Sequence, residues 1–185
     1  MIRWYVLQVS TGQETAVREA LEGLGVRAAV PREERLIRSG GGWTTKVYTL
    51  LPGYVFLALE YSAENYYRVK AIPHVLRFLG PNGLSPSYLT HLEVEWLRLL
   101  DNGGELLKPS KVEELPGGGV RIVEGVLRNF PISSIDYDKR TRRAKVEISL
   151  CGEPKTLTLS VEGGRERGGW EFLNGVYRKP DKAGG

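Results

Sequence analysis

The sequence predicts an α+β protein with two domains, an α/β sandwich on an antiparallel sheet followed by a small β-barrel. Helical and strand patterns alternate over about the first 100 residues, whereas beyond residue 119 the apolar residues recur with a period of two. Residues 101–118 hold four Gly and two Pro and show no periodicity until Val112, which is typical of a linker. We therefore expect domains at 1–100 and 119–162, a flexible linker at 101–118 and a C-terminal tail at 163–185.

The first domain is organised around an apolar run at residues 54–59, preceded by Pro-Gly and followed by a glutamate. A short apolar run with turn residues at its edge is typical of a buried central strand. Strand alternation places three aliphatic residues on one face of this strand, which suits a helix-covered core: Val55, Leu57 and Leu59. The opposite face of the strand, with Tyr54 and Phe56, is either core or an exposed docking surface.

Three elements are expected before this strand. Residues 3–10 are rich in β-forming residues and predict a first strand. Apolar residues at helical spacing predict a helix over 12–24, with Thr11 and Glu14 in the pattern of a capping box. Residues 26–31 predict a second, short strand.

A β-hairpin is expected over residues 33–48, where two polar–apolar alternating runs flank a glycine-rich tip at 39–42. The hairpin carries the basic residues Arg35, Arg38 and Lys46. They have the charge to contact a phosphate backbone, but charged side chains on a solvated hairpin give the same pattern.

Beyond the central strand, Ser62 is an expected N-cap for a helix that Pro73 interrupts, and residues 75–79 predict a further strand. A last helix is expected over about 87–100, with five apolar residues along one side: Leu89, Leu92, Trp96, Leu99 and Leu100.

The second domain reads as short strands joined by tight turns, which is typical of a small β-barrel. No internal repeat is visible. The expected strands lie at 120–123, 132–137, 145–150 and 156–161.

Composition points to a cytoplasmic binding protein and away from an enzyme. The single cysteine, Cys151, permits no internal disulfide, and two distant histidines, His74 and His91, give no metal-site spacing. No phosphate-binding glycine loop and no 18-residue apolar run occur. We expect no catalytic residue, no cofactor, no metal and no membrane association. The net charge of +4 is too small to indicate nucleic acid by itself.

Three stretches of the N-terminal part resemble the N-terminal (NGN) domain of the NusG family of transcription elongation factors: Trp4–Val6, which a helix follows, Pro52–Phe56 and Val75–Gly80. Val120–Phe130 resembles the KOW motif that opens the family's C-terminal, SH3-like barrel. The resemblance covers residues 3–161 in the family's order. The chain departs from the motif at Pro131, where the family usually has a nearby glycine, so we expect this turn to be built differently.

The resemblance implies that the N-terminal domain binds the clamp helices of RNA polymerase through an apolar concavity. Leu51, Tyr54 and Phe56 match that surface by position. Aromatic anchors often contribute about 2 kcal/mol or more each to an interface. The alternative is that all three residues are part of the core.

Residues 135–148 are similar to the LoaP branch of the family, specialised antiterminators whose barrel engages a structured RNA hairpin. Clustered cations neutralise phosphates, and arginine also stacks on bases. Cations on a hairpin also occur simply as soluble surface or edge protection. The residues that the resemblance assigns to nucleic acid are Arg128, Lys139, Arg140, Arg142, Arg143 and Lys145.

The resemblance thus implies a monomeric factor that rides on elongating polymerase and suppresses pausing or termination. Its expected partners are RNA polymerase, a nascent RNA hairpin and upstream DNA. Two alternatives remain open at this point. The first alternative is a general elongation factor whose barrel binds a ribosomal protein or a termination factor. The second is a ribosome-associated KOW protein.

Overall fold

The computed structural model of the chain describes residues 1–80, 85–116, 120–163, 171–173 and 176–178. Most of the predicted tail 163–185 lies outside these residues. Contacts divide the chain into two compact units, neither of which is continuous in sequence. The predicted domains at 1–100 and 119–162 stay a prediction. The first unit comprises 1–32, 49–105 and 147–157, and the second comprises 33–48, 106–146 and the described part of 158–185.

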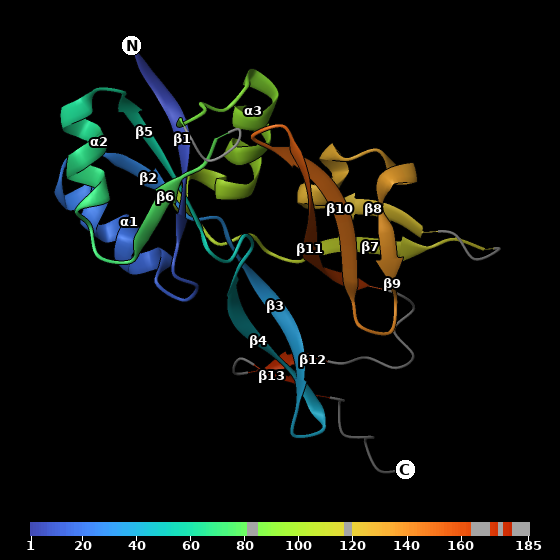
Figure 1. Cartoon of the computed structure of the whole chain (residues 1–185). Helices are drawn as coiled ribbons and strands as arrows, with labels where there is room; N and C mark the ends of the chain where they lie inside the picture. Colours follow the sequence, from blue (N-terminus) through green and yellow to red (C-terminus); the bar gives the residue numbers. More distant parts are fainter. Residues whose placement is uncertain (81–84, 117–119, 164–170, 174–175, 179–185) are drawn as a thin grey trace, which may run out of the picture. The chain divides into compact units, whose positions relative to one another are not determined.

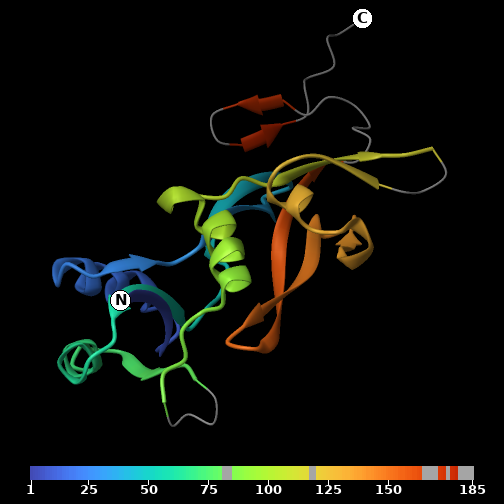
Figure 2. The same ribbon diagram turned by 90° about the horizontal axis from the view of Figure 1, so that it is seen from above.

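The first unit contains an antiparallel sheet in the order β2-β5-β1-β6, which confirms the predicted sandwich. Its strands are β1 (Ile2–Val9), β2 (Arg27–Ala29), β5 (Tyr54–Glu60) and β6 (Val75–Phe78). Figures 1 and 2 show two helices on one face of this sheet and a third helix on the other. These helices are α1 (Glu14–Gly23) and α2 (Ala63–Lys70) on the first face, and α3 (His91–Asp101) on the second.

The aliphatic face of β5 forms the core of the first unit, as its alternation predicts. Val55 and Leu57 have no exposed surface, and they belong to one buried cluster with residues of α1 and α2. Burying each such side chain contributes roughly 1.5–3 kcal/mol relative to leaving it in water. The helical members of the cluster are Val17, Leu21 and Val69.

The predicted capping box at the start of α1 is wrong. Gln13 precedes the helix without a side-chain cap, and the buried carboxylate of Glu14 accepts hydrogen bonds elsewhere. It accepts from the backbone N–H of Gly12 at 2.9 Å and from that of Gly53 at 2.6 Å. A buried carboxylate requires donors, and these two loop N–H groups satisfy it. Glu14 therefore ties the start of α1 to the turn before β5.

The apolar residues predicted along one side of the last helix are only partly buried. Leu92 is 78% exposed and Leu99 is 41% exposed, whereas Glu93, Leu97 and Leu100 are buried. The helix begins at His91 with a complete capping box between Thr90 and Glu93, so its phase is set by a buried glutamate. Apolar spacing alone does not reveal this phase.

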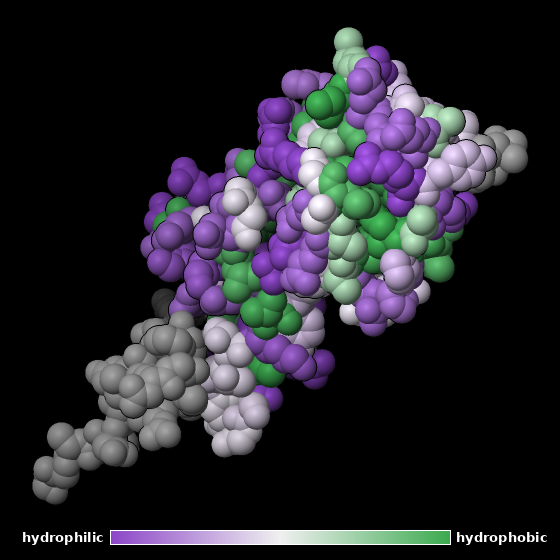
Figure 3. Space-filling view, turned by 90° about the vertical axis from the view of Figure 1, so that its left-hand side faces the viewer, coloured by the Kyte–Doolittle hydropathy of each residue, from purple (hydrophilic) through white to green (hydrophobic). Residues whose placement is uncertain are grey.

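Hydrophobic residues also reach the surface of the first unit. On the face drawn in Figure 3, patches of hydrophobic residues lie among hydrophilic ones. Scattered exposed apolar side chains are normal on folded proteins, and by themselves they mark no site.

A second sheet has the order β8-β7-β11-β10-β9. Most of it belongs to the second unit, whereas residues 147–150 of β10 and 153–157 of β11 belong to the first. Strand β7 (Ser110–Glu114) lies inside the predicted linker 101–118 and pairs in parallel with β11, with Ser110 opposite Val161. The predicted strand 132–137 is a 3-10 turn followed by a short β9, with Ser134 N donating to Pro131 O at 2.9 Å. The remaining strands are β8 (Val120–Glu124), β9 (Asp136–Asp138), β10 (Arg143–Leu150) and β11 (Glu153–Gly163).

The predicted hairpin forms from β3 (Arg32–Ser39) and β4 (Gly42–Thr49), joined by Gly40 and Gly41. Both glycines have positive φ, 58° and 82°, as a two-residue hairpin turn requires. β4 also pairs with β13 (Val176–Arg178), which pairs in turn with β12 (Glu171–Leu173).

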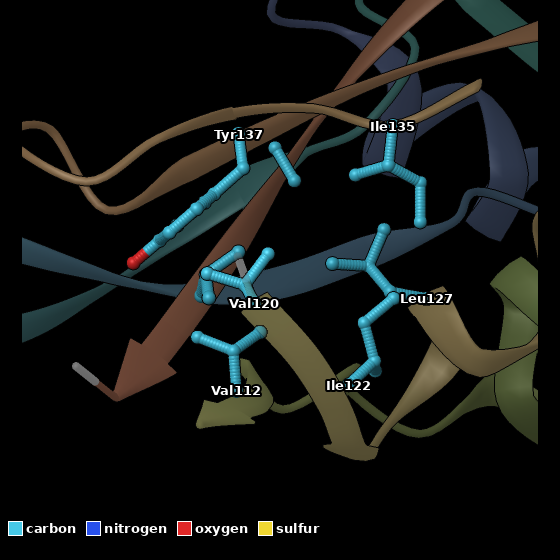
Figure 4. A pocket seen from close by; sticks show the side chains of 8 residues that line it. Val112, Val120, Ile122, Leu127, Ile135 and Tyr137 are labelled. Atoms are coloured by element: carbon cyan, nitrogen blue, oxygen red, sulfur yellow. The ribbon is translucent and has the colours of Figure 1, made fainter. Parts of the chain in front are cut away.

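Apolar side chains converge inside the five-stranded sheet of the second unit (Figure 4). They leave a cavity of about 40 Å³, which has room for a few water molecules and not for a cofactor. The hydroxyl of Tyr137 is buried without a hydrogen-bond partner, and burial raises its pKa, with Glu114 adding to the effect. The other lining residues are Val112, Val120, Ile122, Leu127, Ile135, Ala144 and Val161.

Gly125 is expected to be irreplaceable in this sheet. Its φ is +99°, and a Cβ there would lie 2.5 Å from Ser110 Oγ and 2.6 Å from Ser110 Cα. We predict that Gly125→Ala lowers the free energy of unfolding by more than about 2 kcal/mol, measured by urea denaturation. Gly41→Ala is the control, because its φ is +82° with open space around it, and it should cost only about 1 kcal/mol. Equal losses in the two variants would contradict the close approach.

Candidate functional site

Of the three residues assigned to the polymerase surface, Leu51 and Phe56 are buried and Tyr54 is partly exposed. Leu51 is 5% exposed and Phe56 has no exposed surface. The ring of Phe56 packs edge-on against Trp96 of α3, with the ring centroids 5.7 Å apart. The structure therefore places Phe56 and Leu51 beneath the surface and Tyr54, which is partly buried, at its edge.

Tyr54 lies beside a polar cavity of about 130 Å³ within the first unit. Lys155 Nζ is 5.9 Å from the centroid of its ring. Burial, with the charges of Glu93 and Glu153, raises the pKa of the Cys151 thiol to about 11. The thiol is therefore protonated at neutral pH, which is the opposite of what a nucleophile requires. Other residues lining this cavity are Arg77, Leu79, Gly80 and Leu150.

Glu93 fixes the β10–β11 turn against the start of α3. Its Oε1 accepts from Ser149 Oγ at 3.0 Å and from Gly152 N at 3.1 Å, while Oε2 accepts from Thr90 N at 2.8 Å. Burial tends to raise the pKa of this carboxyl, but its hydrogen bonds outweigh burial and lower the pKa. The ionised carboxylate thus holds the turn next to the cavity that Tyr54 lines.

The basic segment forms the turn between β9 and β10. The carboxylate of Asp138 accepts from Arg140 N at 2.9 Å and from Thr141 N at 3.2 Å, which fixes the turn. Lys139 is exposed and forms an ion pair with Glu114 at 2.5 Å. Of the other candidate cations, Arg140, Arg128 and Lys145 are exposed and Arg142 is partly exposed.

Arg143 differs from the other candidate cations because its guanidinium is used inside the protein. Nη2 donates to Leu36 O at 2.8 Å, and Nη1 donates to Arg142 O at 2.9 Å and to Ser160 Oγ at 3.3 Å. Burial, together with the neighbouring charge of Arg35, lowers its pKa. With its donors engaged, Arg143 has a structural role, which the sequence cluster did not reveal.

The buried acid next to Arg143 was not singled out from the sequence. Glu33 is 1% exposed, accepts from Ser160 N at 2.9 Å, and forms an ion pair with Arg35. Burial raises the pKa of Glu33 more than these hydrogen bonds and the two nearby arginines lower it. In sequence it is one of several alternating charges, so no local signal identified it.

Aromatic residues of the hairpin lie against cations. The guanidinium of Arg142 is 4.4 Å from the centroid of Trp43, and that of Arg35 is 4.7 Å from Tyr48. Lys46 Nζ is 5.7 Å from the centroid of Tyr48. The sequence indicated the basic residues of the hairpin but not Trp43, although basic and aromatic residues interleaved on one strand are a usable signal.

Among the described residues, no cluster of His, Cys, Asp and Glu is arranged to hold a metal ion. No helix in the same set is long and apolar enough to cross a bilayer.

Comparison with known proteins gives one consistent result. The family model described as "Transcription termination factor nusG" matches residues 2–98. The chain is 29% identical over 169 residues to the transcription termination/antitermination protein NusG of Helicobacter pylori, covering 86% of this chain and 95% of that protein. It is 31% identical over 170 residues to the protein of the same name from Pasteurella multocida, covering 85% and 91%.

A solved structure of Thermotoga maritima NusG has the same fold, with a TM-score of 0.56 and 23% sequence identity. The match covers 87% of this chain and 94% of that one. It therefore includes both the antiparallel sandwich and the β-rich part of the chain.

Arg143 and Arg140 should respond differently to removal. We predict that Arg143→Ala lowers the free energy of unfolding by about 2 kcal/mol, because Leu36 O and Ser160 Oγ lose a charged donor and the buried Glu33 loses a nearby positive charge. Arg140→Ala should change it by no more than about 0.5 kcal/mol, because that side chain is exposed. Chemical denaturation of both variants measures the difference. An unchanged stability in Arg143→Ala would contradict the structural role.

Proposed function

Because the chain belongs to the NusG family, we propose that it binds the clamp helices of RNA polymerase and favours processive elongation. The family consists of transcription factors and not of enzymes. The main support is the joint occurrence, in family order, of the antiparallel sandwich and the β-rich part, at about 30% identity to the relatives. By binding one clamp state better than others, such a factor shifts the population towards elongating polymerase.

Tyr54 is the contact residue of this proposal, and Leu51 and Phe56 are its support. A partly exposed aromatic ring supplies large, rigid contact area to a partner. Phe56 lies beneath the surface, where its packing with Trp96 holds β5 against α3. Tyr54 would therefore touch the polymerase, whereas Leu51 and Phe56 would support it from the core, although the sequence assigned all three to the same surface.

For the barrel we propose binding of nascent, structured RNA, as in a specialised antiterminator of the LoaP type, with upstream DNA as a further contact. The support is the exposed or partly exposed cations of the β9–β10 turn and the start of β10, together with Arg128, which is exposed in the 3-10 turn Val126–Asn129. Cations of this kind neutralise phosphates and release counterions. The residues proposed to contact RNA are Arg128, Lys139, Arg140, Arg142 and Lys145, with Arg143 holding the turn.

The first test concerns the polymerase. We predict that Tyr54→Ala lowers the affinity for RNA polymerase roughly 30-fold, a loss of about 2 kcal/mol, while the protein remains folded. Phe56→Ala should instead unfold the first unit or destabilise it by about 3–5 kcal/mol, because it creates a core cavity. Co-purification with polymerase and thermal melts separate the two effects. Undiminished binding of a folded Tyr54→Ala variant would refute the assignment.

The second test concerns RNA and uses the whole chain, because a fragment beginning at residue 119 would lack β7 and leave β8 unpaired with its sheet. We predict that the double variant Arg140→Ala, Lys145→Ala weakens binding to labelled leader hairpins and reduces the salt slope of log Kd by about 1 per lost contact. Fluorescence anisotropy across a salt series measures both quantities.

The matched control for the RNA test is Arg98→Ala, which removes one exposed arginine of α3 in the first unit. It should leave affinity and slope unchanged. Weak binding without preference for any hairpin would favour the general elongation factor, whose barrel binds a protein partner. The relatives named above are consistent with that alternative.

A further inference from the structure

Trp43 lies next to the tip of the β3–β4 hairpin and outside the buried core. It is the second residue of β4, directly after the glycine turn of the hairpin, and its side chain is only partly buried. It is not a member of the buried core, and the guanidinium of Arg142 lies over its ring, 4.4 Å from the ring centroid. An aromatic ring held beside a guanidinium outside the core is a surface on which a further planar group can stack.

Arg142 is held in place by its own backbone. Its carbonyl oxygen accepts from Val161 N at 3.0 Å and from Arg143 Nη1 at 2.9 Å, and its φ is 55°. These bonds fix a residue in the left-handed region, where a non-glycine residue is uncommon. The guanidinium of Arg142 is thereby directed from a rigid turn.

The hairpin is tied to the same turn by polar contacts of β3. Leu36 O accepts from Arg143 Nη2 at 2.8 Å, and Leu36 N donates to Ser160 Oγ at 3.3 Å. Arg35 Nη2 donates to Thr158 O at 2.8 Å. All these residues belong to the second unit, so Trp43 and the basic turn form parts of one surface.

The charge around Trp43 is positive. The two-residue turn sets Arg38 opposite Trp43 on the neighbouring strand, and Arg38 is exposed. Within the part of the chain that the structure describes, Arg38, Arg140 and Arg142 form no ion pair. The nearest carboxylate of the turn, that of Asp138, is engaged with two backbone N–H groups. Arg142 and, by the hairpin register, Arg38 therefore lie beside the ring, and the exposed Arg140 belongs to the same turn as Arg142.

We propose that Trp43 and Arg142 form a stacking site for one unpaired RNA base, and that the β3–β4 hairpin and the β9–β10 turn bind RNA together. This inference rests on the RNA binding proposed above and extends it to a site on the hairpin. Bases inside a duplex are stacked on their neighbours, whereas loop bases splay out and stack on aromatic rings and guanidinium planes. The site therefore selects hairpin loops, while the surrounding cations contact the backbone of loop and stem alike.

The test compares two synthetic RNAs with the whole protein, a hairpin with an unpaired loop and a blunt duplex of the same stem. Trp43→Ala should weaken binding of the hairpin roughly 5- to 100-fold and leave binding of the duplex unchanged. The salt slope should stay as in the wild type, because no cation is lost. Trp43→Phe, which keeps a stacking ring, should retain most of the affinity and guards against a folding defect in the alanine variant.

Tyr67→Ala is the matched control, since it removes a 70% exposed aromatic ring of the first unit and should bind both RNAs normally. Quenching of tryptophan fluorescence by the hairpin should be present in the wild type and reduced in Trp43→Phe. Equal hairpin binding by wild type and Trp43→Ala would overturn the stacking site and leave the proposed RNA binding standing. Failure of the wild type to bind either RNA would overturn both.

Discussion

A buried carboxylate links two strands of the second unit. Glu33 connects β3 to β11 through Ser160, and the guanidinium groups of Arg35 and Arg143 provide the positive charge around it. Burying an ion is costly, and removing one partner of such a group leaves an uncompensated charge. Polar contacts of Glu33, Arg35, Leu36 and Arg143 therefore help to position β3 against β10 and β11.

The arginines of the basic segment have different roles in this network. Arg142 and Arg143 are adjacent in a run of basic residues, yet one faces an aromatic ring and the other donates to backbone and hydroxyl oxygens. Arg143 begins β10, whereas Arg142 lies in the turn before it with a φ of 55°, so neighbours in a charge cluster need not share a function. The number of positive charges determines the electrostatic potential around a surface. Which of these charges can contact a ligand depends on the burial of each guanidinium group.

Sequence patterns identified the elements whose causes are local. The alternation in β5, the helix capped by Ser62 and the glycine turn of the hairpin follow from short-range rules, and both parts of the fold were expected. What the sequence did not reveal depends on distant partners. β7 pairs with β8 on one side and with the distant β11 on the other, and Glu14 bonds to the loop before β5 instead of to Thr11. The burial of Phe56 likewise depends on Trp96 of α3.

The order of strands in the five-stranded sheet has a consequence for synthesis on the ribosome. β11 lies between the β8–β7 pair and the β10–β9 pair, although it is the last of these strands to be made. A nascent chain that ends before β11 can form two separate hairpins with open edges, which are prone to pair with other chains. Early release of the polypeptide would thus yield an aggregation-prone product. Once β11 has been made, it pairs with both hairpins and covers their inner edges.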